Sequence, residues 1–177
     1  MKNVAKEILN TVLYLAVVFV LTLLFITFVA QRTRVIGKSM FPTLEDRDSL
    51  ILEKVSYRFG DPERFDVIVF PYEHGEKQNF IKRVIGLPGE RVRIDYDGNI
   101  YINDELLEEN YGSEVIQDPG IAAEEITVGE DEFFVLGDNR NYSMDSRSPA
   151  VGNIRKSQIM GRALFRIYPF DKIGGID

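Results

Sequence analysis

An uncharged and almost entirely apolar run near the start of the chain limits its fold more than any other feature. The run extends over residues 8–30 and contains no Asp, Glu, Lys or Arg. As an α-helix rising about 1.5 Å per residue it would span roughly 34 Å, and the hydrocarbon core of a bilayer is about 30 Å thick. The sequence therefore predicts a short tail over 1–7 and a transmembrane anchor helix over 8–30.

A cleaved secretory signal is the alternative interpretation of this run. Such a signal has an apolar region of about 7–15 residues and ends in a small-x-small site. Here the run is longer, and the bulky Phe28 stands two positions before Ala30, the best candidate for a cleavage position. We therefore favour an uncleaved anchor. Basic residues flank the run on both sides, so the positive-inside rule does not decide its orientation.

The rest of the chain, residues 31–177, carries short β-rich segments separated by turn residues and shows no long helical period. Candidate strands cover 49–52, 66–70, 80–85 and 132–136. Such runs, rich in β-branched and aromatic residues, are typical of strands. The sequence therefore predicts a mostly β fold, in which an antiparallel sheet or barrel-like domain follows a single N-terminal transmembrane helix.

Two segments of this body have a more specific pattern. Apolar residues alternate around Asp97-Gly98, which predicts a β-hairpin over 92–102 with a two-residue turn. The stretch 104–132 contains many acidic residues and no basic residue. We interpret it as a solvated hairpin extension or loop.

The composition restricts the chemistry that is available. The chain has no cysteine, which removes disulfides, thiol catalysis and Cys-ligated zinc. Its one histidine, His74, lies in a polar run, so a Ser-His-Asp triad would have to depend on it. If the domain is hydrolytic, a serine activated by a lysine and a carboxylate pair both remain open.

Ser39 has the most unusual surroundings of the serines. Gly37 precedes it by two positions, and Pro42 and Thr43 follow it. The glycine lets the backbone come close to a ligand, and the proline favours a fixed turn that aims backbone N–H groups at one point. Such donors are what an oxyanion hole requires. On the pattern alone, an ordinary turn serine is the competing interpretation.

Lys82 is the lysine best suited to act as a base. A lysine base must be neutral, and lowering its pKa by about 2–3 units takes roughly 3–4 kcal/mol, which burial or a nearby positive charge must supply. Lys82 has the most apolar flanks of the lysines, with Phe80-Ile81 before it and Val84-Ile85 after it. A solvated strand position is the competing interpretation.

Three segments together resemble the type I signal peptidase family. Residues 39–43 resemble its Ser-Met-x-Pro-Thr box, and residues 80–90 resemble its lysine box. Residues 137–147 resemble its Gly-Asp-Asn-Arg…Ser-x-Asp-Ser-Arg box, while 66–70 match a weaker strand box. The boxes follow the order of the family, and the resemblance extends over nearly the whole chain, the apolar run included.

The resemblance implies a membrane-bound serine endopeptidase that removes signal peptides from exported preproteins after small-x-small sites. Ser39 would attack the scissile carbonyl, and Lys82 would take its proton as the other member of a Ser-Lys dyad. No cofactor and no metal are implied.

The resemblance also implies supporting roles for the third box. Ser143 would hydrogen-bond and orient the lysine amine, while Asp145 and Arg147 would form an ion pair. Asp138 and Asn139 would hold the loop against the core, and a purely structural role for these two stays open.

The substrate is expected to add a strand to a β edge beside the nucleophile, with small side chains in shallow pockets. The residues expected to contact it are Val35, Ile36, Met40 and Ile81. Some family members have a serine two positions before the nucleophile, where this chain has Gly37. The chain thus resembles the short Gram-positive type, and its oxyanion hole would depend chiefly on the backbone N–H of Ser39.

The implied partners are the signal peptides of secreted preproteins, the lipid bilayer and the protein-export translocon. The implied location is the cell membrane, single-pass, with the catalytic domain on the extracytoplasmic side. No nucleic-acid partner is expected, because the net charge is −7 and no basic patch is evident. The alternatives are another Ser-Lys peptidase, either a self-cleaving repressor or an organelle inner-membrane protease, and a catalytically silent, membrane-tethered β module.

Overall fold

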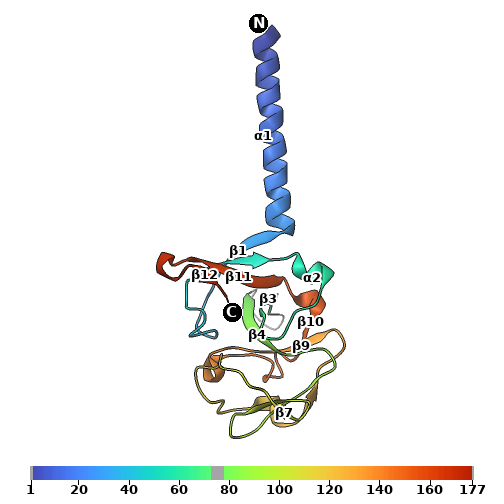
Figure 1. The fold of residues 1–177 in the computed structure, drawn as a ribbon, viewed down its shortest axis with the longest axis vertical. Coiled ribbons are helices and arrows are strands. Elements are labelled where there is room, and N and C mark those ends of the chain that lie inside the picture. Colours follow the sequence, from blue (N-terminus) through green and yellow to red (C-terminus); the bar gives the residue numbers. More distant parts are fainter. Residues whose placement is uncertain (1, 73–77, 177) are drawn as a thin grey trace.

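The computed structural model describes residues 2–72 and 78–176, in which one long helix precedes a β-rich body (Figure 1). His74 lies outside the described residues. The helices are α1 (Lys2–Phe28), α2 (Ser56–Phe59), η1 (Gly120–Ala123), η2 (Arg140–Tyr142), η3 (Lys156–Gln158) and η4 (Phe170–Lys172), where η denotes a 3-10 helix. The strands are β1 (Ala30–Arg34), β2 (Ser49–Glu53), β3 (Val67–Pro71), β4 (Asn79–Gly86), β5 (Arg91–Ile94), β6 (Ile100–Ile102), β7 (Glu105–Leu106), β8 (Ile126–Thr127), β9 (Glu132–Leu136), β10 (Ile154–Arg155), β11 (Gly161–Tyr168) and β12 (Gly174–Gly175).

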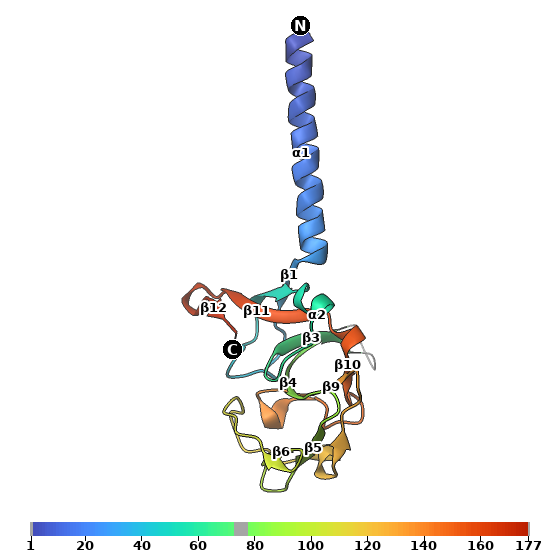
Figure 2. The ribbon, with the colours of Figure 1, turned by 45° about the vertical axis from the view of Figure 1, so that its right-hand side comes forward.

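Helix α1 carries the apolar run and projects away from the body (Figures 1 and 2). It is long and apolar enough to cross a membrane, and none of its apolar window is buried within the protein. The sequence predicts this helix over 8–30, whereas the observed helix begins at Lys2 and ends at Phe28, and Ala30 already belongs to β1. The β-rich body therefore begins almost directly at the end of the helix.

All the strand pairs are antiparallel, which confirms the mostly β body. The larger sheet has the order β1-β2-β11-β3-β4-β9-β10, and β12 pairs with β11. The smaller sheet has the order β7-β6-β5-β8 and lies at the end of the body away from α1 (Figures 1 and 2). Buried residues of both sheets form a common core between them: Ile85, Phe134 and Leu136 from the larger, and Val92, Ile94 and Ile100 from the smaller.

The predicted hairpin forms, but its turn differs from the prediction. Strands β5 and β6 pair with Ile94 opposite Ile100, and the Asp95 N–H donates to the Asn99 carbonyl. Three residues, 96–98, therefore form the loop, and the prediction that Asp97-Gly98 alone makes a two-residue turn is wrong. The Asp95 carboxylate accepts the N–H groups of Asp97 and Asn99, which stabilises this longer loop, while Gly98 adopts a positive φ of 85°.

The acidic stretch 104–132 is more integrated than the sequence predicts. It contributes β7 and β8 to the smaller sheet, and Ile116, Ala122 and Val128 are buried in the core between the sheets. Its acidic residues also find basic partners outside the stretch. Glu109 pairs with Arg140 at 2.8 Å in a largely buried contact. Partners distant in sequence thus anchor a stretch that has no local cation.

Candidate active site

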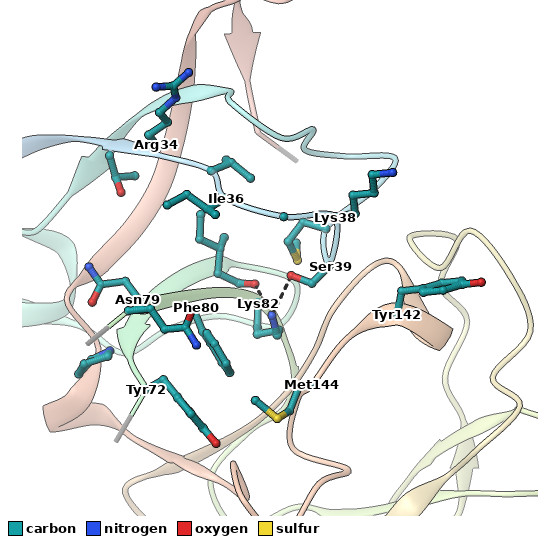
Figure 3. A pocket seen from close by; sticks show the side chains of 17 residues that line it. Arg34, Ile36, Lys38, Ser39, Tyr72, Asn79, Phe80, Lys82, Tyr142 and Met144 are labelled. Atoms are coloured by element: carbon teal, nitrogen blue, oxygen red, sulfur yellow. Dashed lines mark hydrogen bonds between the residues drawn. The ribbon is translucent and has the colours of Figure 1, made fainter. Parts of the chain in front are cut away.

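The side chains of Ser39 and Lys82 meet, although 43 positions separate them. Lys82 Nζ donates a hydrogen bond to Ser39 Oγ at 2.9 Å (Figure 3). Strand β4 positions the lysine, and the segment that follows β1 positions the serine. The same amine donates to the Ile81 carbonyl at 3.0 Å and lies 4.8 Å from the centre of the Phe80 ring.

Burial adapts Lys82 to act as a base. Its side chain belongs to the interior, with 3% of the residue exposed. This burial lowers the pKa of Lys82 from 10.5 to about 8, although the carboxylates of Asp145 and Asp138 raise it in part. About a tenth of the amine is therefore neutral at pH 7, and a neutral amine can accept the proton of the Ser39 hydroxyl.

The cleavage rate should therefore depend on pH through Lys82. Because the neutral amine is the active form, we expect kcat/KM to rise about tenfold per pH unit below about 7 and to level off above about 8. The measurement is kcat/KM from pH 5 to pH 10 on a peptide without ionisable side chains. A rate that stays constant down to pH 5 would contradict the role of this amine.

The loop that follows β9 holds the backbone of the Ser39 segment. The Asn139 N–H donates to the Ser39 carbonyl at 3.0 Å, and Asn139 Nδ2 donates to the Lys38 carbonyl at 3.0 Å. Gly137 lies between two groups of the site: a Cβ there would come within 2.2 Å of Ser143 Oγ and 2.4 Å of the Ser39 carbonyl oxygen. Only glycine therefore allows this close approach.

A buried ion pair fixes the same loop to β4. Arg83 Nε and Nη2 donate to the two carboxylate oxygens of Asp138 at 2.9 and 2.8 Å, and both side chains are fully buried. Thr43 Oγ1 donates to the same carboxylate at 2.5 Å, and the Arg83 guanidinium lies over the Tyr111 ring. One carboxylate thus joins β4, the turn after Ser39 and the loop after β9.

The third box, residues 137–147, contains a second ion pair and a buried hydroxyl that lacks its predicted hydrogen bond. Arg147 donates to both carboxylate oxygens of Asp145 at 2.9 Å, and Asp145 accepts the Gly137 N–H. The predicted hydrogen bond between Ser143 and Lys82 is not made: Ser143 Oγ is buried and has no partner among the described residues. A supporting role for Ser143 stays a prediction; its hydroxyl lies against Gly137, which is also close to the Ser39 carbonyl.

A groove of about 890 Å³ opens over Ser39 and Lys82 (Figure 3). The four residues expected to contact substrate all line it: Val35, Ile36, Met40 and Ile81. Sequence reasoning missed further lining residues, among them Thr33, Arg34, Tyr72, Phe80, Tyr142 and Met144. Tyr142 and Met144 alternate with the predicted positions of the third box, and this was the one signal in the sequence that could have identified them.

The groove has backbone on two sides. β1 is an edge strand of the larger sheet and leads into the lining segment 35–40. On the opposite side, the pairing of β4 with β9 begins only at Arg83. The β4 residues before it pair with β3 along one edge, and among the described residues their other edge has no strand partner and borders the groove. The groove thus has strand-edge backbone on both sides, and such edges can form main-chain hydrogen bonds to an added extended segment.

Gly37 has a conformation that explains the departure from serine at this position. Its φ is +91°, which L side chains rarely adopt, whereas no atom lies within 4 Å of where a Cβ would be. Backbone strain, not lack of space, therefore favours glycine. The Gly37 N–H donates to Asp46 at 2.9 Å, so it is engaged. The Ser39 N–H makes no hydrogen bond within the described residues and is free to face an oxyanion.

Comparison with known proteins decides the family. The model of the family described as signal peptidase, peptidase S26, matches residues 8–168. The chain belongs to peptidase family S26. A probable signal peptidase I-2 of Synechocystis sp. is 42% identical over 84% of this chain and 67% of that protein. Signal peptidase IB of Staphylococcus aureus is 33% identical over 94% of this chain and 93% of that protein.

A solved structure, that of a signal peptidase I from Enterococcus faecalis V583, is also similar. It is 36% identical and matches 58% of this chain and 97% of that chain, with a TM-score of 0.48. As an S26 member, this protein is a serine endopeptidase of the Ser-Lys type. Family membership sets aside the catalytically silent module and the self-cleaving repressor. Within residues 2–72 and 78–176, no group of three His, Cys, Asp or Glu residues is arranged to hold a metal ion.

Proposed function

We propose that this protein removes signal peptides from exported preproteins, with Ser39 as nucleophile and Lys82 as general base. The observation that carries the assignment is the 2.9 Å hydrogen bond between Lys82 Nζ and Ser39 Oγ in a buried setting. Burial supplies the lowered pKa that a lysine base needs. The activity itself follows from the S26 family.

The reaction proceeds in two acyl-transfer steps. Ser39 Oγ attacks the carbonyl carbon before the cut while Lys82 accepts its proton, and the Ser39 N–H donates to the oxyanion that forms. The Lys82 ammonium then gives the proton to the departing amine, which leaves an ester on Ser39. Water attacks this ester, with Lys82 again as base, and releases the signal peptide.

The groove supports selection of small side chains before the cut. In an extended peptide, the first and third residues before the cut lie on one face, and the second lies on the other. Met40, Ile81 and Val35 are buried under the groove, at 8% exposure or less, so they leave little depth for large side chains. This surface therefore suits small side chains at the first and third positions before the cut, while the second position can carry a side chain of any size.

Cleavage of matched preproteins tests this specificity. Alanine to phenylalanine at the first position before the cut should lower kcat/KM by roughly 10²-fold, because a large ring does not fit over these buried residues. The same change at the second position should cost only a few-fold. Equal cleavage of all three substrates would contradict the proposal, and mass spectrometry confirms that the cut stays at the same bond.

The bilayer is the proposed setting of the reaction, with α1 as a single-pass anchor and the body on the extracytoplasmic side. Two contacts hold the helix end against the body: Arg58 lies over the Phe28 ring, and Lys54 Nζ donates to the Thr27 carbonyl at 3.5 Å. A signal peptide is apolar where it crosses the membrane and is cut just beyond, so enzyme and substrate then share one plane. The protein-export translocon stays a predicted partner.

Single cysteines test the orientation, because the chain has none of its own. Arg155→Cys, at an exposed position of β10, should react with a membrane-impermeant maleimide on intact cells. Val4→Cys, near the other end of α1, should react only after the membrane is permeabilised. The reverse labelling pattern would overturn the proposed orientation.

A further inference from the structure

Two exposed side chains at one end of the groove, those of Lys38 and Tyr142, have no evident role in the fold. Both line the groove, and Tyr142 is 76% exposed. Within the described residues, neither the Lys38 amine nor the Tyr142 hydroxyl makes a hydrogen bond or ion pair. Their backbones are nevertheless fixed, since the Lys38 carbonyl accepts Asn139 Nδ2 and the Tyr142 N–H donates to the Asn139 carbonyl. A fixed backbone thus presents two side chains whose polar groups make no hydrogen bond or ion pair within the described residues and can bind a ligand.

These side chains lie beyond the nucleophile as seen from the membrane anchor. In Figure 3, Arg34 and Ile36 are on one side of Ser39, while Lys38 and Tyr142 are on the other. Arg34 is the last residue of β1, which leads directly from the end of α1. A substrate that leaves the membrane beside α1 therefore fills the Arg34 side with residues before the cut. The residues after the cut then occupy the opposite end.

The charge of Lys38 is available to a ligand. The carboxylate held beside its segment is that of Asp46, and both of its oxygens are engaged: Oδ1 by the Gly37 N–H at 2.9 Å, and Oδ2 by Arg47 at 3.5 Å. Lys38 is thus a cation at the groove with no carboxylate bound to it among the described residues. The exposed Tyr142 ring supplies an apolar face at the same end.

We propose that Lys38 and Tyr142 bind the first residues of the mature protein and favour an acidic side chain there. The inference rests on the proposed cleavage at Ser39. The Lys38 ammonium pairs with the carboxylate, and the Tyr142 ring contacts the extended chain after the cut. Since exposed ion pairs are weak, the preference is about 2- to 5-fold in kcat/KM and decreases with salt. These residues tune the rate among preproteins and do not act in the chemistry.

The test compares two peptides that differ only at the second residue after the cut, Glu or Lys, using the full-length enzyme in detergent. The wild type should cleave the Glu peptide about 2- to 5-fold faster in kcat/KM. Lys38→Glu should reverse this ratio. Arg155→Glu makes the same charge change outside the groove and should keep the wild-type ratio. An identical ratio in the wild type and Lys38→Glu would overturn the inference.

A second comparison isolates Tyr142. It uses a peptide with six residues after the cut and one with a single residue there, and records the ratio of their kcat/KM values. Tyr142→Ala should lower this ratio several-fold, whereas Tyr96→Ala, at a similarly exposed tyrosine of the distal hairpin, should not. A ratio unchanged in Tyr142→Ala would refute its role. Failure of the wild type to cleave the peptide with six residues after the cut would instead count against the proposed function.

Discussion

Replacing Lys82 with methionine is expected to abolish cleavage and, at the same time, to stabilise the fold. The loss of activity follows from the dyad: removal of the base should lower kcat by about 10⁴-fold or more, as for other coupled nucleophile–base pairs. The gain in stability follows from burial, because the charged amine lies in an interior that disfavours charge. Methionine has a similar length and carries no charge.

The sign of the stability change follows from proton linkage. The folded pKa of about 8 lies below the unfolded value of 10.5, so between these values the unfolded chain binds more protons. The free energy of unfolding of the wild type should therefore rise as pH increases from about 8 to about 10.5, by about 3 kcal/mol in total. Below pH 8 the buried charge costs this amount, and Lys82→Met should be more stable by up to about 3 kcal/mol.

Ser39→Ala is the matched control for this experiment. It should also abolish cleavage, but it keeps the buried amine. Its free energy of unfolding should therefore still increase between about pH 8 and about pH 10.5, as in the wild type. Thermal unfolding of the full chain in detergent at pH 7 and pH 10 provides the comparison. A fully active Lys82→Met enzyme would end the dyad assignment. A Lys82→Met variant less stable than the wild type at pH 7 would show that burial of the charged amine does not destabilise the fold.

The largest expected destabilisation comes from removal of Asp138. Asp138→Ala leaves the Arg83 guanidinium buried without its carboxylate, and loss of one partner of a buried pair costs about 3–5 kcal/mol. Because Asp138 also accepts from Thr43 and precedes Asn139, which holds the Ser39 carbonyl, activity should fall with stability. Chemical unfolding of the variant and the wild type measures the difference.

Two further variants show whether the destabilisation comes from breaking the buried ion pair. Asp104→Ala breaks the exposed pair with Arg91 and should have a far smaller effect, since water screens that pair. The double replacement Arg83→Met with Asp138→Leu removes both charges and should recover part of the lost stability. If Asp138→Ala unfolds no more easily than Asp104→Ala, the buried pair does not hold this loop.

The sequence by itself determined the elements whose signals are local. A run of 23 uncharged residues can satisfy its backbone in a membrane only as a helix, and short β-branched runs between turns favour strands. It also singled out Ser39 and Lys82, because glycine and proline beside a serine, and apolar flanks beside a lysine, are visible without neighbours in space. Their roles came from resemblance to a family, since spacing in the chain does not measure distance.

Only the tertiary structure decided which distant residues meet. The pairing of β3 with β4, and the loop after β9, bring Ser39, Lys82 and Asn139 together. The same long-range contacts bury Ile116 in a stretch whose acidity predicts a solvated loop. Which distant strands pair, and which residues they bury, depends on partners far along the chain, and a local pattern does not identify those partners. The pKa of Lys82 depends on that burial, and so the chemistry of the site was decided by the fold.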